Sequence, residues 1–161
     1  MRYVKLFKTM NKKLISIFGI ALFLIAANHQ LAISQETVTA KKQIKTATAS
    51  ATAPFSQGIE ANGFVFLSGT LGAEAGNDVV SQLTQIVTTI SDILREAGCT
   101  IDDVVKATVF LTDMKNYAAM NEAYLKLFHP PYPARTCVEV SALPREGALI
   151  EVEVIAVKKN F

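Results

Sequence analysis

The closing stretch of the chain, residues 132–157, constrains the fold most strongly, because it contains two runs with the alternating pattern of a β-strand. The first run reads ARTCVEV and the second reads IEVEVIAV, and a short polar loop separates them. Arg135 and Cys137 share one face of the first run, since side chains alternate between the faces of a strand. Glu151 and Glu153 share one face of the second. We expect the two runs to pair, which would bring a guanidinium close to a carboxylate. Such a pair can hold a small anionic substrate and orient a water molecule.

The residues alone leave a simpler alternative open. An ion pair of Arg135 with Glu139 or Glu151 would explain the same pattern, because charged residues on a strand are ordinarily paired or solvated.

Charge is unevenly distributed along the chain. Five of the 16 basic residues and none of the 14 acidic residues lie within positions 1–34, so the remainder carries 11 basic and 14 acidic side chains. This mildly acidic remainder has no cluster of Lys and Arg, the pattern typical of nucleic-acid binding. We therefore expect no nucleic-acid partner.

Residues 1–34 are interpreted as a secretory signal peptide. Basic residues precede an apolar run at 14–27, and small residues near Ala27 and Ser34 offer cleavage sites. The apolar run is shorter than the roughly 20 residues of a membrane-spanning helix, although an uncleaved anchor is the alternative. We expect a periplasmic or secreted protein with no membrane association after cleavage.

A composition change marks the start of the folded domain. Residues 35–52 are rich in Thr, Ala and Lys without hydrophobic periodicity, and they are expected to form a flexible linker. The domain is expected to span residues 53–161. It contains Cys99, Cys137 and His129, and no set of residues at the spacing of a zinc site.

Hydrophobic periodicity predicts the order β-β-α-β-α-β-β. The dipeptide Asn62–Gly63 between two short strand patterns predicts a hairpin. Apolar residues recur every three or four positions over 78–97 and again over 116–128, which predicts two amphipathic helices, and the β-branched run 104–111 predicts a strand between them. We expect an α+β domain in which both helices cover one face of a mixed sheet. The other face is also apolar, so we expect it to be covered in a homo-oligomer.

Several motifs resemble the Rid family of reactive intermediate deaminases, also called YjgF-like proteins. The resemblance rests on PARTCVEVSALP followed by IEVEVIAV, and on the segments APFSQGI, FLSG, DDVVKATVFLTDM and MNEAY in the same order. It covers residues 53–157. It implies a chorismate-mutase-like (YjgF-like) α+β fold and a homotrimer whose active sites lie in clefts between subunits.

The resemblance also implies an activity. Members of the RidA type hydrolyse 2-imino or enamine acids, such as 2-aminoacrylate and 2-iminobutanoate, to 2-keto acids and ammonia without a cofactor. By resemblance Arg135 holds the substrate carboxylate and Glu151 positions or activates the attacking water. The other pocket positions that match the family are Ser68, Gly69, Asn121, Tyr124 and Cys137. The expected partners are a small imino or keto acid and further copies of this chain, with no metal.

The chain also departs from the family pattern. Phe55 replaces the Tyr of the opening motif at a further pocket position, and Thr70 replaces the usual Gln. These differences motivate an alternative function, a non-enzymatic trimer that binds small carboxylates or a protein partner. Cys137 is expected to form a pocket wall, because no His stands at a position suited to activate its thiol.

Overall fold

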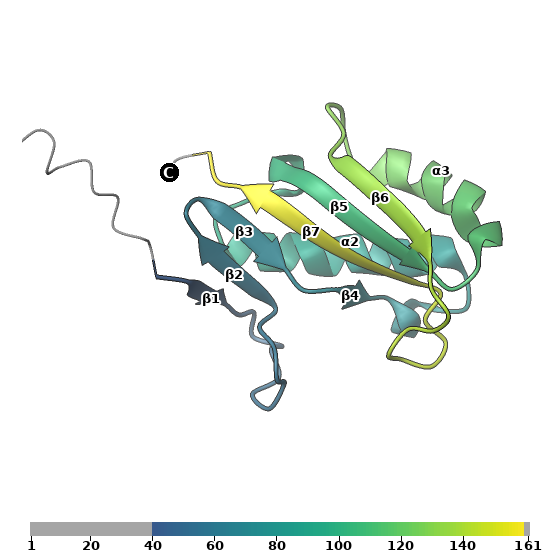
Figure 1. The fold of residues 1–161 in the computed structure, drawn as a ribbon, viewed down its shortest axis with the longest axis horizontal. Coiled ribbons are helices and arrows are strands. Elements are labelled where there is room, and N and C mark those ends of the chain that lie inside the picture. Colours follow the sequence, from purple (N-terminus) through teal and green to yellow (C-terminus); the bar gives the residue numbers. More distant parts are fainter. Residues whose placement is uncertain (1–39, 160–161) are drawn as a thin grey trace, which may run out of the picture. The chain divides into compact units, whose positions relative to one another are not determined.

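The computed structural model describes residues 40–159 as a seven-stranded mixed sheet with two α-helices (Figure 1). The predicted signal peptide, residues 1–34, lies outside the described residues. The strands are β1 (Lys42–Ile44), β2 (Gly58–Ala61), β3 (Phe64–Leu67), β4 (Thr70–Leu71), β5 (Val104–Leu111), β6 (Ala134–Glu139) and β7 (Ile150–Val157), and the helices are α2 (Val79–Glu96) and α3 (Tyr117–Leu127). Neither of these helices is long and apolar enough to cross a membrane.

The sheet has the strand order β1-β2-β3-β7-β5-β6, and the short strand β4 also pairs with β7. Strands β5 and β6 are parallel, whereas the other pairs are antiparallel. The predicted α+β class and mixed sheet are therefore confirmed. The expected pairing of the two closing runs is wrong, because β5 lies between β6 and β7. The chain leaves β5, passes through α3 and returns as β6, which pairs with β5 in parallel. Strand β7 pairs with β5 on its other side.

The N-terminal edge of the sheet differs from the prediction. Residues 42–44, which we assigned to a flexible linker, form β1 and pair with β2. Ile44 is buried against Gly58, because a glycine on β2 leaves room for its side chain. A three-residue strand is too short to show an alternating pattern in the sequence. Residues 42–44 form a strand because the outer edge of β2 offers hydrogen-bond partners, and this pairing is visible only in the structure. The predicted hairpin is confirmed: Asn62 and Gly63 join β2 to β3 with φ angles of 49° and 75°.

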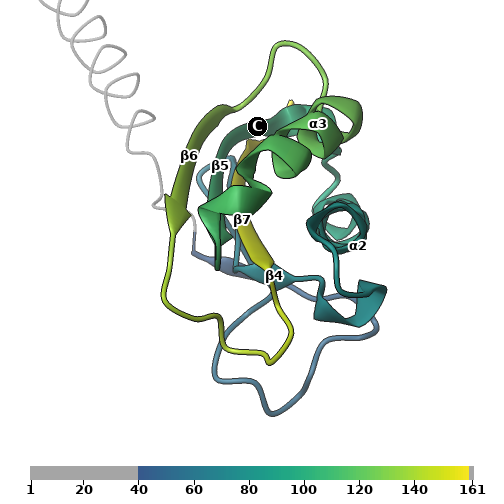
Figure 2. The same ribbon diagram turned by 90° about the vertical axis from the view of Figure 1, so that its right-hand side faces the viewer.

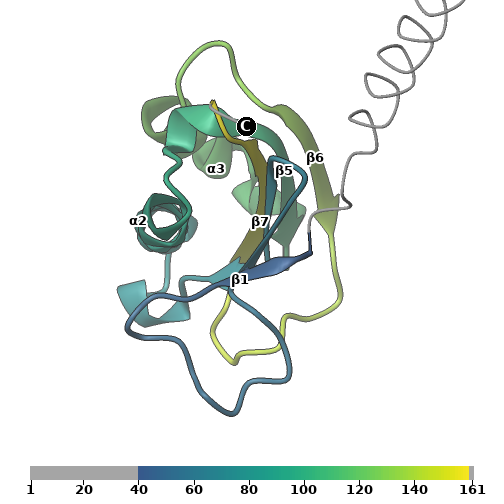
Figure 3. The ribbon, with the colours of Figure 1, turned by 90° about the vertical axis from the view of Figure 1, so that its left-hand side faces the viewer.

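Both helices lie on the same side of the sheet, as the two side views show (Figures 2 and 3). Helix α2 begins after Asp78, whose carboxylate accepts a hydrogen bond from the Ser81 amide at 2.8 Å, and it ends before Gly98 at φ +74°. Its stripe from Val79 to Leu94 is buried against the sheet. These observations confirm the first predicted helix.

Helix α3 buries a narrower stripe than its sequence suggests. Met120, Tyr124 and Phe128 are buried, but Leu125 is 59% exposed and Tyr117 is 40% exposed. Figure 2 shows α3 near the β6 edge of the sheet.

The face of the sheet away from the helices exposes large apolar side chains. Phe64, Phe66 and Val138 are each between 38% and 44% exposed. Their alternating neighbours, such as Val65, are buried on the helix side. This face has the apolar character on which the predicted association is based, and the homotrimer stays a prediction.

Candidate functional site

Arg135 lies on β6 and points toward the helices. It is in register with Ala107 of β5, and both side chains therefore face α3. Its Nη2 donates a hydrogen bond to Asn121 Oδ1 at 2.6 Å, and its Nη1 approaches the Met120 sulfur at 3.7 Å. The guanidinium stacks over the Tyr124 ring, 4.5 Å from the centroid. The arginine is thus held in one orientation by a neutral amide and an aromatic ring.

Tyr124 supports Arg135 with its ring, and its hydroxyl is enclosed. Its ring also stacks on Phe128, with centroids 4.1 Å apart and an interplanar angle of 14°. Burial raises the pKa of Tyr124 to about 12, against the opposing effect of the nearby Arg135 charge. The buried hydroxyl has no hydrogen-bond partner among residues 40–159. A buried hydroxyl without a hydrogen bond lowers the free energy of unfolding.

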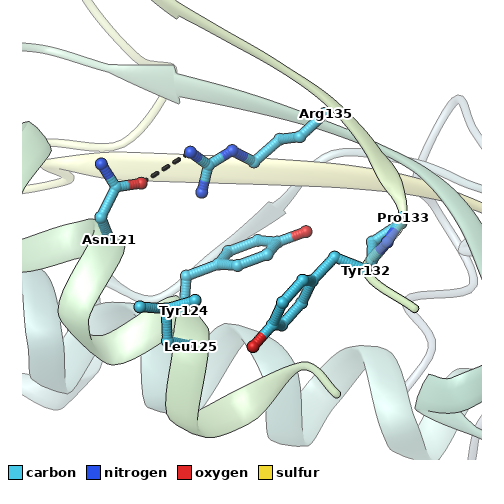
Figure 4. A pocket seen from close by; sticks show the side chains of 6 residues that line it. All are labelled: Asn121, Tyr124, Leu125, Tyr132, Pro133 and Arg135. Carbon is cyan, nitrogen blue, oxygen red and sulfur yellow. Dashed lines mark hydrogen bonds between the residues drawn. The ribbon is translucent and has the colours of Figure 1, made fainter. Parts of the chain in front are cut away.

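Arg135 borders two hollows. One is a cavity of about 470 Å³ lined by Asn121, Tyr124, Leu125, Tyr132, Pro133 and Arg135 (Figure 4). The other, of about 320 Å³, is lined by Met114, Tyr117, Arg135 and Cys137. Burial raises the pKa of the Cys137 thiol, and the Arg135 charge opposes this effect only in part. Cys137 is therefore an uncharged thiol beside the guanidinium, consistent with a pocket wall.

Glu151 lies on the opposite face of the sheet. It is in register with Phe110 of β5, whereas the helix-facing positions of β5 are Ala107 and Val109. Its carboxylate lies against Gly69: a Cβ at that glycine would overlap Oε1 and lie 2.8 Å from Cδ. Burial raises the pKa of Glu151, and the charge of Glu153 raises it further.

Of the remaining predicted positions, Ser68 precedes the glycine that lies against Glu151, and Phe55 lies in a different hollow. The Ser68 hydroxyl donates a hydrogen bond to the Ser56 carbonyl at 2.7 Å, which fixes the strand end that precedes Gly69. Phe55 adjoins Ser56 and is 62% exposed. It lines a separate hollow with Gln43 and Ala53, so it does not contribute to the cavities at Arg135 of the same chain.

The predicted residues therefore form two clusters within one chain. The arginine cluster consists of Arg135, Asn121, Tyr124 and Cys137, and the glutamate cluster consists of Glu151, Gly69 and Ser68. Phe55 belongs to neither cluster of the single chain. Arg135 and Glu151 align with β5 positions three residues apart and lie on either side of that strand. Strand geometry then separates their Cα atoms by roughly 14 Å, with their side chains on opposite faces. The two clusters cannot act on one small molecule within a single chain.

A buried amide that the sequence analysis missed joins the loops around Glu151. Gln82 of α2 is fully buried, and its Nε2 donates to the Gly76 and Gly147 carbonyls at 2.8 and 2.9 Å. Its Oε1 accepts from the Leu149 amide at 2.9 Å. The sequence does contain a sign of this role: Gln82 is a polar residue within the apolar stripe of α2, one helical turn after Val79. Leu125, Tyr132 and Pro133 of the cavity wall were also missed as site residues, because isolated apolar residues carry no chemical signature.

The side chains that could bind a metal ion are dispersed over the described residues. Within residues 40–159 no three His, Cys, Asp or Glu side chains come close enough together to hold an ion.

Comparison with known proteins identifies the family. The family model described as endoribonuclease L-PSP matches residues 45–158. A solved Yersinia pestis structure, described as a protein of unknown function of the conserved Rid protein family, is 41% identical. It covers 73% of this chain and 99% of its own, with a TM-score of 0.68. The chain belongs to the Rid family.

Two curated relatives extend this comparison. The mitochondrial protein MMF1 of Saccharomyces cerevisiae is 43% identical over 115 residues, which cover 68% of this Rid-family chain and 79% of MMF1. A goat protein named 2-iminobutanoate/2-iminopropanoate deaminase is 38% identical over 125 residues, which cover 73% of this chain and 90% of the goat protein.

Proposed function

We propose that this Rid-family protein hydrolyses reactive 2-imino or enamine acids, such as 2-aminoacrylate and 2-iminobutanoate, to 2-keto acids and ammonia. The observation that carries the proposal is the Arg135 guanidinium, which Asn121 and Tyr124 hold at the edge of an open cavity. A guanidinium binds a carboxylate through two parallel hydrogen bonds, so it fixes the orientation of an imino acid as well as its position. The goat relative is named for this reaction.

The second part of the proposal is a composite site in a homotrimer. The arginine cluster of one subunit would meet the glutamate cluster of a neighbour, and the exposed apolar face at Phe64 and Phe66 would be covered between subunits. This arrangement supplies both functional groups to one substrate, although they are on opposite faces of a single chain.

In this site Glu151 takes a proton from water while the water oxygen forms a bond to the imine carbon. That proton passes to the nitrogen and gives a carbinolamine. The hydroxyl proton of the carbinolamine then moves to the nitrogen as the carbon–nitrogen bond breaks, so the keto group forms and ammonia leaves. A general base contributes a typical factor of about 10² to 10⁴ to such a step. Clamping the carboxylate adds the advantage of proximity. The raised pKa of Glu151 favours its action as a base, because a carboxylate of higher pKa accepts a proton more readily.

The proposed compartment is the periplasm or the extracellular space. The basic and apolar segments of residues 1–34 support export.

A non-enzymatic carboxylate-binding trimer is the second candidate. It is favoured by Phe55, which is 62% exposed and lacks the hydroxyl of the Tyr found in most family members. Such a protein would retain the guanidinium and the cavity but would release no product.

The decisive experiment measures keto-acid and ammonia release from 2-aminoacrylate generated in situ, with the full chain and with Arg135→Ala. We expect turnover above spontaneous hydrolysis, and its loss in Arg135→Ala. Arg145→Ala is the matched control, because Arg145 forms an exposed ion pair with Glu74 outside both clusters. Undiminished activity in Arg135→Ala would refute the proposed mechanism. Binding of a keto acid without turnover would identify the carboxylate-binding alternative.

A further inference from the structure

We propose that the cavity beside Arg135 is a subsite for the substrate side chain, and that the protein prefers 2-imino acids with bulky apolar side chains over 2-iminopropanoate. This inference rests on the proposed function and specifies its substrate class. The subsite is the 470 Å³ cavity, and its specificity-determining residues are Leu125 and Tyr132.

The cavity is polar at one end and apolar at the other. Arg135 and Asn121 form the polar end, where the hydrogen bond between them fixes the guanidinium (Figure 4). Leu125, Tyr132 and Pro133 form the apolar walls. A 2-imino acid has the same division, since its carboxylate and its side chain leave the imine carbon in different directions.

The distance between the two ends suits a long side chain. Leu125 follows Asn121 by four residues on α3, so the two are neighbours on one face of the helix, with Cβ atoms about 5–6 Å apart. A carboxylate bound at the Asn121–Arg135 end would therefore direct a substituent of several carbons toward Leu125. A methyl group would not span this distance.

The size of the cavity leads to the same conclusion. At about 30 Å³ per non-hydrogen atom, the share of one water in the liquid, a three-carbon imino acid occupies less than about 180 Å³. The cavity of about 470 Å³ would leave most of its walls uncovered by so small a ligand. Cavities of this size are typical of sites that enclose larger molecules.

Two wall residues of the cavity keep apolar surface exposed in the single chain. Leu125 is 59% exposed and Tyr132 is 47% exposed. Burial of their apolar surface by a ligand side chain would be favourable in proportion to the area covered. A pocket of this kind discriminates by roughly tenfold or more for each missing methylene group.

The experiment compares kcat/KM of the full chain for imines generated in situ from leucine and from alanine by an amino-acid oxidase. We expect the leucine-derived imine to be preferred at least about tenfold. Leu125→Trp fills the cavity and should lower the ratio of the two kcat/KM values at least about tenfold. Lys126→Trp is the matched control, because the next residue of α3 lines a groove on the other side of the helix. It should leave the ratio unchanged.

A binding measurement separates this inference from the proposed function. Calorimetry with 4-methyl-2-oxopentanoate and with pyruvate should show tighter binding of the larger keto acid, and weaker binding of it in Leu125→Trp. If no imine is turned over but this binding difference is found, the proposed function fails and the subsite stands. If imines are turned over with a preference for the alanine-derived imine, or with a ratio insensitive to Leu125→Trp, the subsite is refuted and the function stands. Equal binding of both keto acids would also refute the subsite.

Discussion

Arg135 and Glu151 project from opposite faces of the same sheet, in register with Ala107 and Phe110 of the strand between them. Their Cα atoms are roughly 14 Å apart by strand geometry. A reaction that needs both side chains therefore needs two chains, and this relationship can be tested by complementation.

Co-refolded Arg135→Ala and Glu151→Gln chains should regain activity that neither variant has alone. In a symmetric assembly that mixes at random, about a quarter of the clefts would combine an intact arginine cluster with an intact glutamate cluster. The measurement is the deaminase rate of the mixture relative to wild type. Two inactive variants that remain inactive after co-refolding, with mixed trimers verified by mass, would contradict a composite site.

Gly69→Ala should lower kcat/KM by about 100-fold, because its Cβ would displace the Glu151 carboxylate and a shift of about 1 Å can cost this much. The free energy of unfolding should change little, since the displaced atoms are at the end of a flexible side chain. Gly58→Ala is the control: its Cβ would meet its nearest neighbours at 3.4 Å, in ordinary contact. Full activity in Gly69→Ala would show that the glutamate cluster takes no part in the reaction.

The pH dependence should report Glu151. Because its pKa is raised above the ordinary value of 4.5, the base form is lost on acidification at a pH higher than 4.5, and kcat/KM should fall there. Removing the neighbouring charge in Glu153→Gln should lower this pKa and move the acid limb of the profile to lower pH. If an active Glu151→Gln variant shows the same fall of kcat/KM at low pH, a group other than Glu151 is responsible for it.

Glu151 should also affect stability with a defined sign. The folded state binds its proton more tightly than the unfolded state, so stability is lost as pH rises from 4.5 through the raised pKa. In the dissociated chain, where no guanidinium of a neighbour faces the carboxylate, Glu151→Gln should therefore increase the free energy of unfolding at neutral pH. Urea titrations at several pH values measure this directly, and a less stable Glu151→Gln protein at neutral pH would contradict it.

Tyr124→Phe should increase the free energy of unfolding by about 1 kcal/mol, because it removes a buried hydroxyl that has no partner among residues 40–159. The ring that stacks on Arg135 is retained. Chemical denaturation of the assembled protein measures the change. A destabilised variant would show that the hydroxyl finds a partner across a subunit contact.

Gln82→Leu should destabilise the fold by about 3 kcal/mol, since it leaves two carbonyls and the Leu149 amide without their partner. Gln85→Leu on the same helix is the matched control, because Gln85 Oε1 is buried without a hydrogen bond among the described residues. Equal losses in the two variants would show that the Gln82 bonds contribute nothing specific.

Local signals accounted for most of the fold. The apolar stripe of α2 and the turn at Asn62 each depend on residues a few positions apart, and both predictions are confirmed. The sequence did not predict strand β1, and it predicted the wrong neighbour for β6. Which strands pair with each other depends on segments that are distant in the sequence.

For the site, the sequence by itself determined which residues belong to the family pattern, because the motif around Arg135 and Glu151 is carried by residue types and short spacings. Only the tertiary structure decided how these residues are grouped. The insertion of β5 between β6 and β7 separates the guanidinium from the carboxylate, and it turns them to opposite faces. The packing of α3 against β6 then adds Leu125 and Tyr132 to the arginine cavity. Alternation along a strand is readable from sequence, but the face that each strand presents depends on its register with neighbours, which is set by the packing of the whole sheet.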